Sequence, residues 1–239
     1  MKAIILAAGR GSRLLPLTEA LPKCLLPIAG TTVLGFQLDT LENAGVDEAV
    51  VITGFMSARV EADIARRSGK MAVQTLFNPF YQVADNLASC WMARAHMASD
   101  FLLINGDTLF EQALATSVLE SPQRDIQVTI DKKPSYDSDD MKVMLDGSSL
   151  LEIGKTLGPE KTHGESIGFL RFMGDGPAMF ADKIHQMMRT GDGVSAWFLS
   201  AIDALAKSGV PVATHSIEGR TWAEVDTVED YELVKTRFG

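Results

Sequence analysis

Apolar runs alternate with segments of helical periodicity through the first half of the chain. Residues 2–8 and 49–53 are continuous apolar runs of strand length, so each predicts a buried strand. Residues 33–44 predict a helix, with apolar residues at helical spacing ahead of Gly45, namely Val33, Leu34, Phe36, Leu38 and Leu41. The alternation continues through four further predicted elements: a helix at 57–68, a strand at 71–77, a helix at 86–96 and a strand at 101–105. This pattern predicts a Rossmann-like α/β fold with a doubly wound, mostly parallel mixed sheet, whose ligand crevice lies at the carboxyl ends of the strands.

The pattern changes after residue 125, where apolar and polar residues alternate along three short segments. These segments, 126–131, 141–145 and 150–153, predict strands, and Asp146-Gly147 is typical of a hairpin turn. We therefore expect a small inserted antiparallel subregion that covers one side of the crevice. Four more elements are predicted beyond it: a strand at 167–172 and helices at 177–188, 196–206 and 228–238. We expect a single domain, 1–239, built from two parts, about 1–125 and 126–239.

Composition narrows the class of protein. The chain has 239 residues, of which 46% are hydrophobic and 22% charged, enough to bury a sizeable core. Its formal net charge of −9 argues against a nucleic-acid-binding surface, which would show a basic face. No apolar run approaches the ~20 residues of a membrane span and no signal-like segment precedes the first strand, so a cytoplasmic protein is expected. The two cysteines, Cys24 and Cys90, have no metal-binding spacing, and we expect packed thiols.

A glycine loop with fixed cations follows the first strand. The sequence LAAGRGSR at 6–13 places Gly9 and Gly11 where the backbone can approach a ligand and direct amide groups at phosphate oxygens. Arg10 and Arg13 add planar charged groups that suit phosphate, and Lys23 follows on a segment stiffened by proline. A simple turn is the plain alternative. The arginines and Lys23 together favour a cradle for a polyphosphate.

Two better-known glycine loops are excluded by named residues. The spacing GxxxxGK followed by Ser or Thr, which defines a Walker A loop, does not occur. A dinucleotide fingerprint would have a third glycine where Leu14 stands and an acid at the end of the second strand, where the chain instead runs from Thr53 into Gly54.

Several motifs together resemble the nucleotidylyltransferase family that activates phosphorylated sugars and alcohols. The resemblance covers essentially the whole chain and rests on LAAGRGSR at 6–13, Pro16, Thr18, Pro22-Lys23, Pro27, Asn105-Gly106-Asp107 and residues 222–226 (WAEVD). Within that family, residues 78–81, 86–89 and 222–231 are similar to the cytidylyltransferase branch that includes bacterial phosphocholine cytidylyltransferases. The resemblance implies a nucleotidyltransferase fold of the GT-A-like kind, with nucleotide bound by residues about 1–125 and acceptor by about 126–239.

The resemblance also implies site residues and a cofactor. Asp107 and Asp226 are expected to hold Mg²⁺, which prefers hard oxygens, commonly one or two carboxylates with waters and substrate phosphates. Arg13 is expected to bind the β- and γ-phosphates of CTP, and Lys23 to bridge the α-phosphate and the acceptor phosphate. The residues expected to bind the nucleotide are Leu6, Ala7, Ala8, Gly9, Arg10, Gly11, Ser12, Arg13, Asn86, Ser89 and Gly106.

The expected reaction is direct displacement of pyrophosphate by an acceptor phosphate oxygen. Because a phosphomonoester has its second pKa near about 6, this nucleophile is ionised at neutral pH and needs no general base. The four scattered histidines and the absence of a nucleophile elbow agree with that. Charge neutralisation by Mg²⁺ and fixed cations is then the main catalytic requirement.

Acceptor contacts are less sharply marked by the sequence. The resemblance implies that Lys155 is a second lysine for the acceptor phosphate, beside Lys23. The further candidates are Asp131, Glu165, Trp197 and Trp222, because aromatic faces and acids suit a quaternary ammonium, while the acids alone suit hydroxyl groups. Trp197 lies on a predicted helix beside Phe198, where a core role is the stronger expectation. The acidic run at 137–140 is typical of a solvated loop.

Three of the candidate site residues also suit a purely structural role at the start of a helix. Asp226 would suit the N-cap of the helix near Val228, while Asn86 and Ser89 would suit a helix start and its first-turn hydroxyl.

The sequence therefore favours a Mg²⁺-dependent cytidylyltransferase acting on a small phosphorylated alcohol, with phosphocholine first and 2-aminoethylphosphonate or a polyol phosphate behind it. An alternative is a sugar-1-phosphate nucleotidylyltransferase using UTP or dTTP, although residues 78–89 lack the glycine-rich base-binding turn typical of those enzymes. A second alternative is a nucleotide-sensing domain without turnover, which would be expected to lack a metal acid or the lysine. A glycosyltransferase is disfavoured because Asn105-Gly106-Asp107 lacks paired acids.

Overall fold

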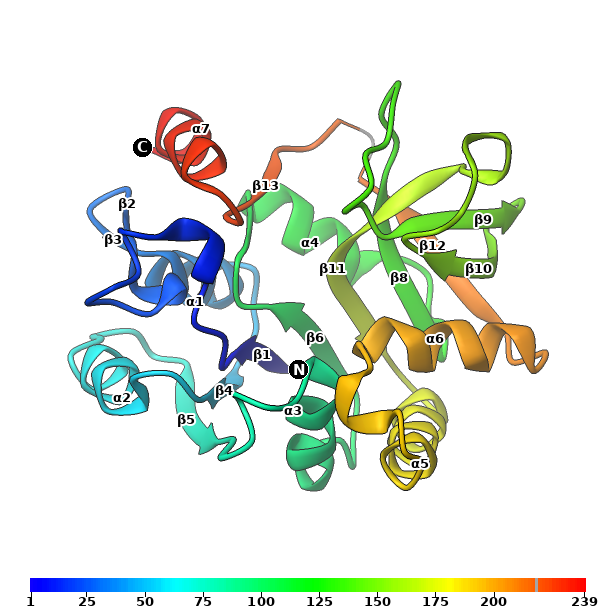
Figure 1. Ribbon diagram of the computed structural model, residues 1–239, viewed down its shortest axis with the longest axis horizontal. Coiled ribbons are helices and arrows are strands. Elements are labelled where there is room, and N and C mark those ends of the chain that lie inside the picture. The colour runs from blue at the N-terminus through cyan, green and yellow to red at the C-terminus, as the bar shows by residue number, and fades with distance from the viewer. Residues whose placement is uncertain (218) are drawn as a thin grey trace.

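A nine-stranded mixed sheet runs through the computed structural model, which describes residues 1–217 and 219–239 (Figure 1). Its order is β5-β4-β1-β6-β11-β8-β12-β10-β9. The first four of these strands pair in parallel, and they are β5 (Ala72–Phe77), β4 (Glu48–Thr53), β1 (Lys2–Ala7) and β6 (Phe101–Asn105). The carboxyl ends of β1 and β6 therefore lie side by side, with Leu6 in register with Asn105.

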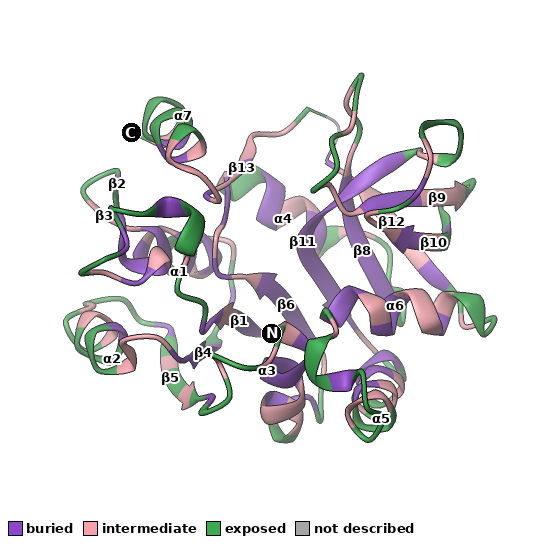
Figure 2. Cartoon of the chain, viewed as in Figure 1, coloured by how far each residue is buried: buried purple, intermediate pink, exposed green. Residues whose placement is uncertain are grey.

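Helices cover both faces of this sheet, as the alternation of strand side chains requires. Ile5 of β1 packs toward α1 (Val33–Asn43), α2 (Ser57–Ala65) and α4 (Gln112–Glu120). Its neighbour Ile4 packs toward α3 (Asn86–Met92), α5 (Gly176–Met188) and α6 (Phe198–Lys207). Figure 2 shows the central strands β6, β8 and β11 as buried, since helices lie against them on both sides.

The second half of the sheet closes on itself. Its strands are β8 (Ile126–Asp131), β9 (Lys142–Asp146), β10 (Ser149–Gly154), β11 (Gly164–Phe172) and β12 (Val212–Ser216). Besides the linear order, β11 also pairs with β9, so these five strands form a closed circuit in which only β8 and β12 pair in parallel. This is the antiparallel subregion expected from the sequence, and it lies beside the first half in Figure 1.

A small two-stranded sheet connects the end of β6 to the last helix. Strand β7 (Thr108–Phe110) follows β6 after a short turn and pairs antiparallel with β13 (Trp222–Glu224). Helix α7 (Val228–Phe238) then begins at a capping box in which Thr227 and Asp230 satisfy each other's backbone amide groups. The N-cap is therefore Thr227, and the interpretation of Asp226 as the cap is wrong. A second small sheet pairs β2 (Pro27–Ile28) with β3 (Thr31–Thr32).

The α/β fold class is confirmed, and most predicted elements occur within a few residues of their expected bounds. Three predicted helices were misplaced at one end. The helix predicted at 57–68 ends at Ala65, the one at 86–96 is α-helical only to Met92 before a 3₁₀ turn (Ala93–His96), and the one at 196–206 begins at Phe198. Helix α4 and strands β7 and β12 were not predicted. No helix within the described ranges, 1–217 and 219–239, is both long and apolar enough to cross a membrane.

Candidate active site

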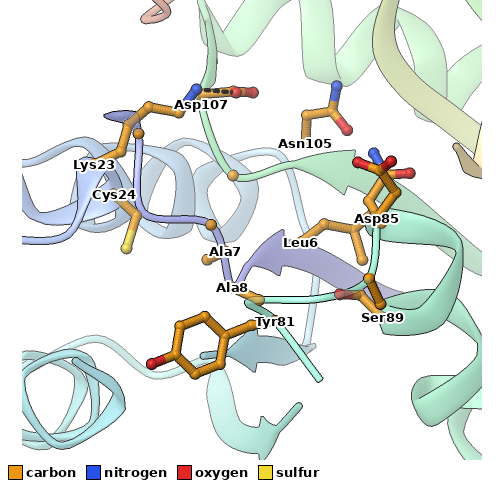
Figure 3. Close-up of a pocket in the computed structure, with 15 residues that line it drawn as sticks. Leu6, Ala7, Ala8, Lys23, Cys24, Tyr81, Asp85, Ser89, Asn105 and Asp107 are labelled. Atoms are coloured by element: carbon orange, nitrogen blue, oxygen red, sulfur yellow. Dashed lines mark hydrogen bonds and ion pairs between the residues drawn. The ribbon is translucent and has the colours of Figure 1, made fainter. Parts of the chain in front are cut away.

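A pocket of about 300 Å³ lies at the carboxyl ends of β1 and β6. Most of the residues expected to bind a nucleotide line it: Leu6, Ala7, Ala8, Gly9, Gly11, Asn86, Ser89 and Gly106. Lys23 and Asp107, expected to act on the phosphates and the metal, line it as well. Cys24, Tyr81, Ala84, Asp85 and Asn105 complete its lining and were not among the residues expected to bind a nucleotide. Figure 3 shows Lys23 and Asp107 pointing toward each other on one side of this pocket, with Asp85 and Ser89 on the other.

The glycine loop turns at Gly11 and is held there by a nearby hydroxyl group. Gly11 has a φ of 74°, in the left-handed region, and its carbonyl oxygen accepts a hydrogen bond of 2.8 Å from the Thr18 hydroxyl. A Cβ at Gly11 would lie 2.8 Å from the Cβ of Lys23, so the loop and the lysine are closely packed. Arg10, Ser12 and Arg13 lie outside the lining of the pocket. The Arg10 guanidinium lies 5.4 Å from the ring centre of Phe55.

Lys23 lies between the two aspartates expected to hold a metal. It follows an extended Pro22 and opens a 3₁₀ turn, η2 (Lys23–Leu25). Its Nζ lies 2.5 Å from Oδ2 of Asp107 and 2.7 Å from Oδ1 of Asp226. Burial disfavours its charge, but the two carboxylates outweigh this and raise its pKa above the ordinary value. The structure therefore brings together three groups that are far apart in the sequence.

A third acidic residue, Glu224, and an unpaired carboxylate oxygen of Asp107 make the cluster around Lys23 suitable for a divalent cation. Burial, reinforced by the charges of Asp107 and Asp226, raises the pKa of Glu224 to about 8. Oδ1 of Asp107 is buried and has no hydrogen-bond partner within the described part of the chain. An unpaired buried carboxylate oxygen is costly unless a ligand satisfies it, so the donor set fits a hard cation such as Mg²⁺. Glu224 was not predicted as part of the site.

Across residues 1–217 and 219–239, no three His, Cys, Asp or Glu side chains are arranged as a metal-binding group. Two carboxylates completed by waters and substrate phosphates are the usual arrangement for Mg²⁺ at phosphoryl-transfer sites. Asp107 and Asp226 could supply two such carboxylates.

Two further cations that were expected to bind phosphate contact an acidic loop. The guanidinium of Arg13 lies 3.1 Å from Oδ2 of Asp226 and 2.9 Å from Oδ2 of Asp139. Lys155 lies 3.2 Å from Oδ1 of the same Asp139, and its Nζ is 4.7 Å from the ring centre of Trp197. Asp139 thus bridges a cation of the first half and a cation of the second, while its side chain stays 65% exposed, as expected for a solvated run.

Three of the acceptor-binding candidates, Asp131, Trp222 and Glu165, take part in two short networks of hydrogen bonds and ion pairs. The indole Nε1 of Trp222 donates a hydrogen bond of 2.9 Å to Oδ2 of Asp131. Glu165 is buried and lies 3.0 Å from Nζ of Lys133, which also pairs with Asp140 at 2.7 Å. Because β8 and β11 are neighbours in the sheet, Asp131 lies directly opposite Glu165. Asp131 and Glu165 thus lie side by side on neighbouring strands of the second half.

Trp197 is not a core residue, which corrects the stronger expectation from the sequence. It precedes α6 rather than lying within it, and 41% of its surface is exposed. The predicted helix began two residues too early, so the tryptophan was placed on the buried face.

Asn86 and Ser89 line the pocket and also hold the local structure. Oδ1 of Asn86 accepts a hydrogen bond from the backbone amide of Phe198, so it ties α3 to the start of α6. The hydroxyl of Ser89 accepts one from Nδ2 of Asn78 at 3.1 Å. Asn86 is also the first residue of α3, as the helix-start interpretation proposed. The pocket position and the structural role therefore occur together.

Glu165 predicts a measurable pH dependence of stability. Its burial, with the hydrogen bond to Asp140 adding, raises its pKa to about 7 from an ordinary 4.5. Between these values the folded protein holds a proton that the unfolded chain has lost, so the free energy of unfolding falls as the pH rises. We expect Glu165→Gln to remove a slope of up to about 1.4 kcal/mol per pH unit, measured by urea unfolding between pH 5 and 7.

The control for this measurement is Glu61→Gln, which alters an exposed glutamate on α2. It should leave the slope of the unmodified protein unchanged. Equal slopes for Glu165→Gln and the unmodified protein would contradict the expectation.

Comparison with known proteins shows which protein family this sequence matches. The family model described as "Nucleotidyl transferase" matches residues 2–141. A CMP-5'-(3-aminopropyl)phosphonate synthase of Streptomyces rubellomurinus is 32% identical over 123 residues, 52% of this chain and 20% of that protein. A choline-phosphate cytidylyltransferase of Streptococcus pneumoniae is 29% identical over 121 residues, 51% of each chain. These alignments thus span about half or less of the relatives' own lengths.

A solved structure supports the architecture over the full length. The CTP:phosphocholine cytidylyltransferase of Streptococcus pneumoniae aligns with a TM-score of 0.80 at 21% identity, covering 98% of this chain and 97% of that one. At this identity the likeness shows the fold, which is that of a nucleotidyltransferase.

Proposed function

Because the chain belongs to the nucleotidyl transferase family, we propose that it is a Mg²⁺-dependent cytidylyltransferase that transfers CMP from CTP to a small phosphorylated alcohol, with release of pyrophosphate. One observation carries this proposal. Nζ of Lys23 lies within 2.7 Å of both Asp107 and Asp226, beside a pocket whose walls are the glycine loop and the start of α3. The arrangement combines a fixed cation, two metal-binding carboxylates and a phosphate cradle at one place.

The glycine loop and its cations would hold the triphosphate. The pyrimidine would lie in the pocket between β1 and α3, where Asn86 and Ser89 offer polar groups at the edge of a cavity of about 300 Å³. Arg13 would take the β- and γ-phosphates in exchange for Asp139, because a guanidinium binds phosphate oxygens in the bidentate manner in which it binds carboxylate.

The chemical step needs positioning and charge neutralisation more than proton transfer. An oxygen of the acceptor phosphate attacks the α-phosphorus of CTP, the bond from that phosphorus to the bridging oxygen breaks, and pyrophosphate leaves with the electron pair. Lys23 would stabilise the charge that develops around the α-phosphorus, since its pKa is raised and it stays protonated. Asp107 and Asp226 would hold Mg²⁺, which when bound shields the phosphates and orients them.

The acceptor that we favour carries a positive charge in addition to its phosphate, with phosphocholine first and 2-aminoethylphosphonate next. The second half presents the acids Asp131, Glu165 and Asp139 together with the indole rings of Trp197 and Trp222. Carboxylates and aromatic faces bind ammonium groups, whereas a neutral polyol would use only the carboxylates. The names of the two relatives, an aminopropylphosphonate and a choline-phosphate enzyme, support the same class of acceptor.

A substrate panel tests the proposal directly. The purified protein with Mg²⁺ would be given each common nucleoside triphosphate with phosphocholine, 2-aminoethylphosphonate, inositol phosphate, glycerol phosphate or glucose 1-phosphate, and pyrophosphate release would be measured. We expect release with CTP and an ammonium-bearing acceptor. Release only with UTP or dTTP and the sugar phosphate would overturn the proposal in favour of a sugar nucleotidyltransferase. Nucleotide binding with no release on any pair would favour the sensing domain.

A further inference from the structure

We propose that Gln37 is a positioning residue for Asp107, holding the turn that carries this carboxylate from inside the core. The inference rests on the proposed function, in which Asp107 is a metal ligand. Gln37 lies on α1 and is completely buried. Its Nε2 donates hydrogen bonds of 2.8 Å to the carbonyl oxygen of Asn105 and 2.7 Å to that of Thr108. These two carbonyl groups lie on either side of the turn that presents Asp107.

The turn itself is fixed by the backbone on its other sides. The amide of Gly106 donates to the Leu6 carbonyl at 3.0 Å, and the amide of Val225 donates to the Asp107 carbonyl at 3.1 Å. A Cβ at Gly106 would lie 2.6 Å from the Leu6 oxygen, so the turn is pressed against the end of β1. Gln37 adds a contact to the carbonyl oxygen on each side of the turn, and it does so with a single NH₂ group.

The choice of glutamine at this position is not explained by packing. Its neighbours on the inner face of α1 are Leu34, Leu38 and Leu41, all buried, and a methionine would continue that apolar face. Oε1 of Gln37 is buried without a hydrogen-bond partner in the described ranges, which is unfavourable for stability. A buried glutamine with an unsatisfied oxygen is best accounted for by the two carbonyl groups that its NH₂ group holds in place.

The orientation of the Asp107 carboxylate is only partly fixed by contacts of its own oxygen atoms. Its Oδ2 is engaged by Lys23, while Oδ1 has no partner among the described residues, so no hydrogen bond to Oδ1 fixes the rotation of the carboxylate. The direction in which the carboxylate points is then set by its single contact with Lys23 and by the backbone of the turn. Groups that orient metal ligands in this indirect way typically contribute tenfold or more to metal affinity or activity.

The test compares Gln37→Met, which keeps the packing, with Gln37→Asn, which keeps the amide but withdraws it from the carbonyl oxygens. We expect both variants to raise the Mg²⁺ concentration for half-maximal activity and lower kcat, each by about tenfold, with CTP binding in the absence of metal unchanged. The matched control is Gln127→Met, since Gln127 is another buried glutamine, bonded through Oε1 to the Ser121 hydroxyl away from the pocket. Its Mg²⁺ dependence should equal that of the unmodified protein.

A second readout does not depend on activity. In Gln37→Met, hydrogen exchange of the Gly106 and Val225 amides should speed up about tenfold relative to the unmodified protein, while the amides of β4 keep their rates. Unchanged exchange at these two amides, or the same Mg²⁺ shift in Gln127→Met, would overturn the inference. If the unmodified protein releases pyrophosphate with no substrate pair, the proposed function fails, and the exchange experiment still decides whether Gln37 holds the turn.

Discussion

Asp107→Asn should reduce kcat by on the order of 10³-fold while leaving the protein folded. The substitution keeps the shape of the side chain but removes the negative charge that a divalent cation needs, at a position where Oδ1 is buried and unpartnered. Lys23 keeps its contact with Asp226 at 2.7 Å, so the lysine is not left as an isolated buried charge. For this reason we expect the melting temperature to change by only a few degrees.

The measurement is pyrophosphate release over a range of Mg²⁺ concentrations, with circular dichroism to confirm folding. Asp39→Asn serves as a control, because Asp39 is an exposed residue of α1 that pairs with Arg67 far from the glycine loop. It should retain full activity. A folded Asp107→Asn variant that turns over near the normal rate would remove Asp107 from the metal site.

Lys23→Met should lower kcat by about 10²- to 10³-fold and change KM for CTP by no more than a few fold. The lysine contacts two carboxylates in the protein as it stands, and its proposed role is to stabilise charge that develops only as the α-phosphorus is attacked. An interaction made mainly in the transition state affects kcat rather than substrate affinity. Removal of the cation also leaves the Asp107 carboxylate without its ion-pair partner and Asp226 with Arg13 alone, so this variant should be less stable than Asp107→Asn.

Steady-state kinetics with CTP varied at saturating acceptor separate the two effects. Lys235→Met, which alters an exposed lysine of α7, is the matched control and should behave as the unmodified protein. If Lys23→Met raised KM alone and left kcat intact, the lysine would be a binding residue only.

Much of the site was accessible from the sequence because its chemistry lies at the ends of strands. The glycine loop follows β1 directly and Asp107 follows β6 after one glycine, and these two strands are neighbours in register. Parallel pairing of buried strands therefore places the two groups at one edge of the sheet, as the apolar pattern implied. Lys23 lies in no predicted helix or strand, and it was identified from the Pro22-Lys23 motif instead.

Other parts of the site were not accessible, for specific physical reasons. Gln37 is a polar residue on an apolar helical face, and its function depends on backbone carbonyl groups that the sequence pattern does not locate. The approach of Asp139 to Arg13 and Lys155 is a contact between loops from the two halves of the chain. Trp197 was misplaced because it is the extended residue before α6 and not part of the helix, so helical periodicity does not determine its burial.

The small β7–β13 sheet also connects the two ends of the chain at the site. All nine strands of the large sheet lie between residues 2 and 216, whereas Glu224 and Asp226 lie on or just after β13, beyond the last of those strands. Asp226 nevertheless contacts Lys23 at 2.7 Å, across 203 residues of sequence. Separation of β13 from β7 would therefore withdraw Asp226 from Lys23 while leaving every strand pair of the large sheet in place.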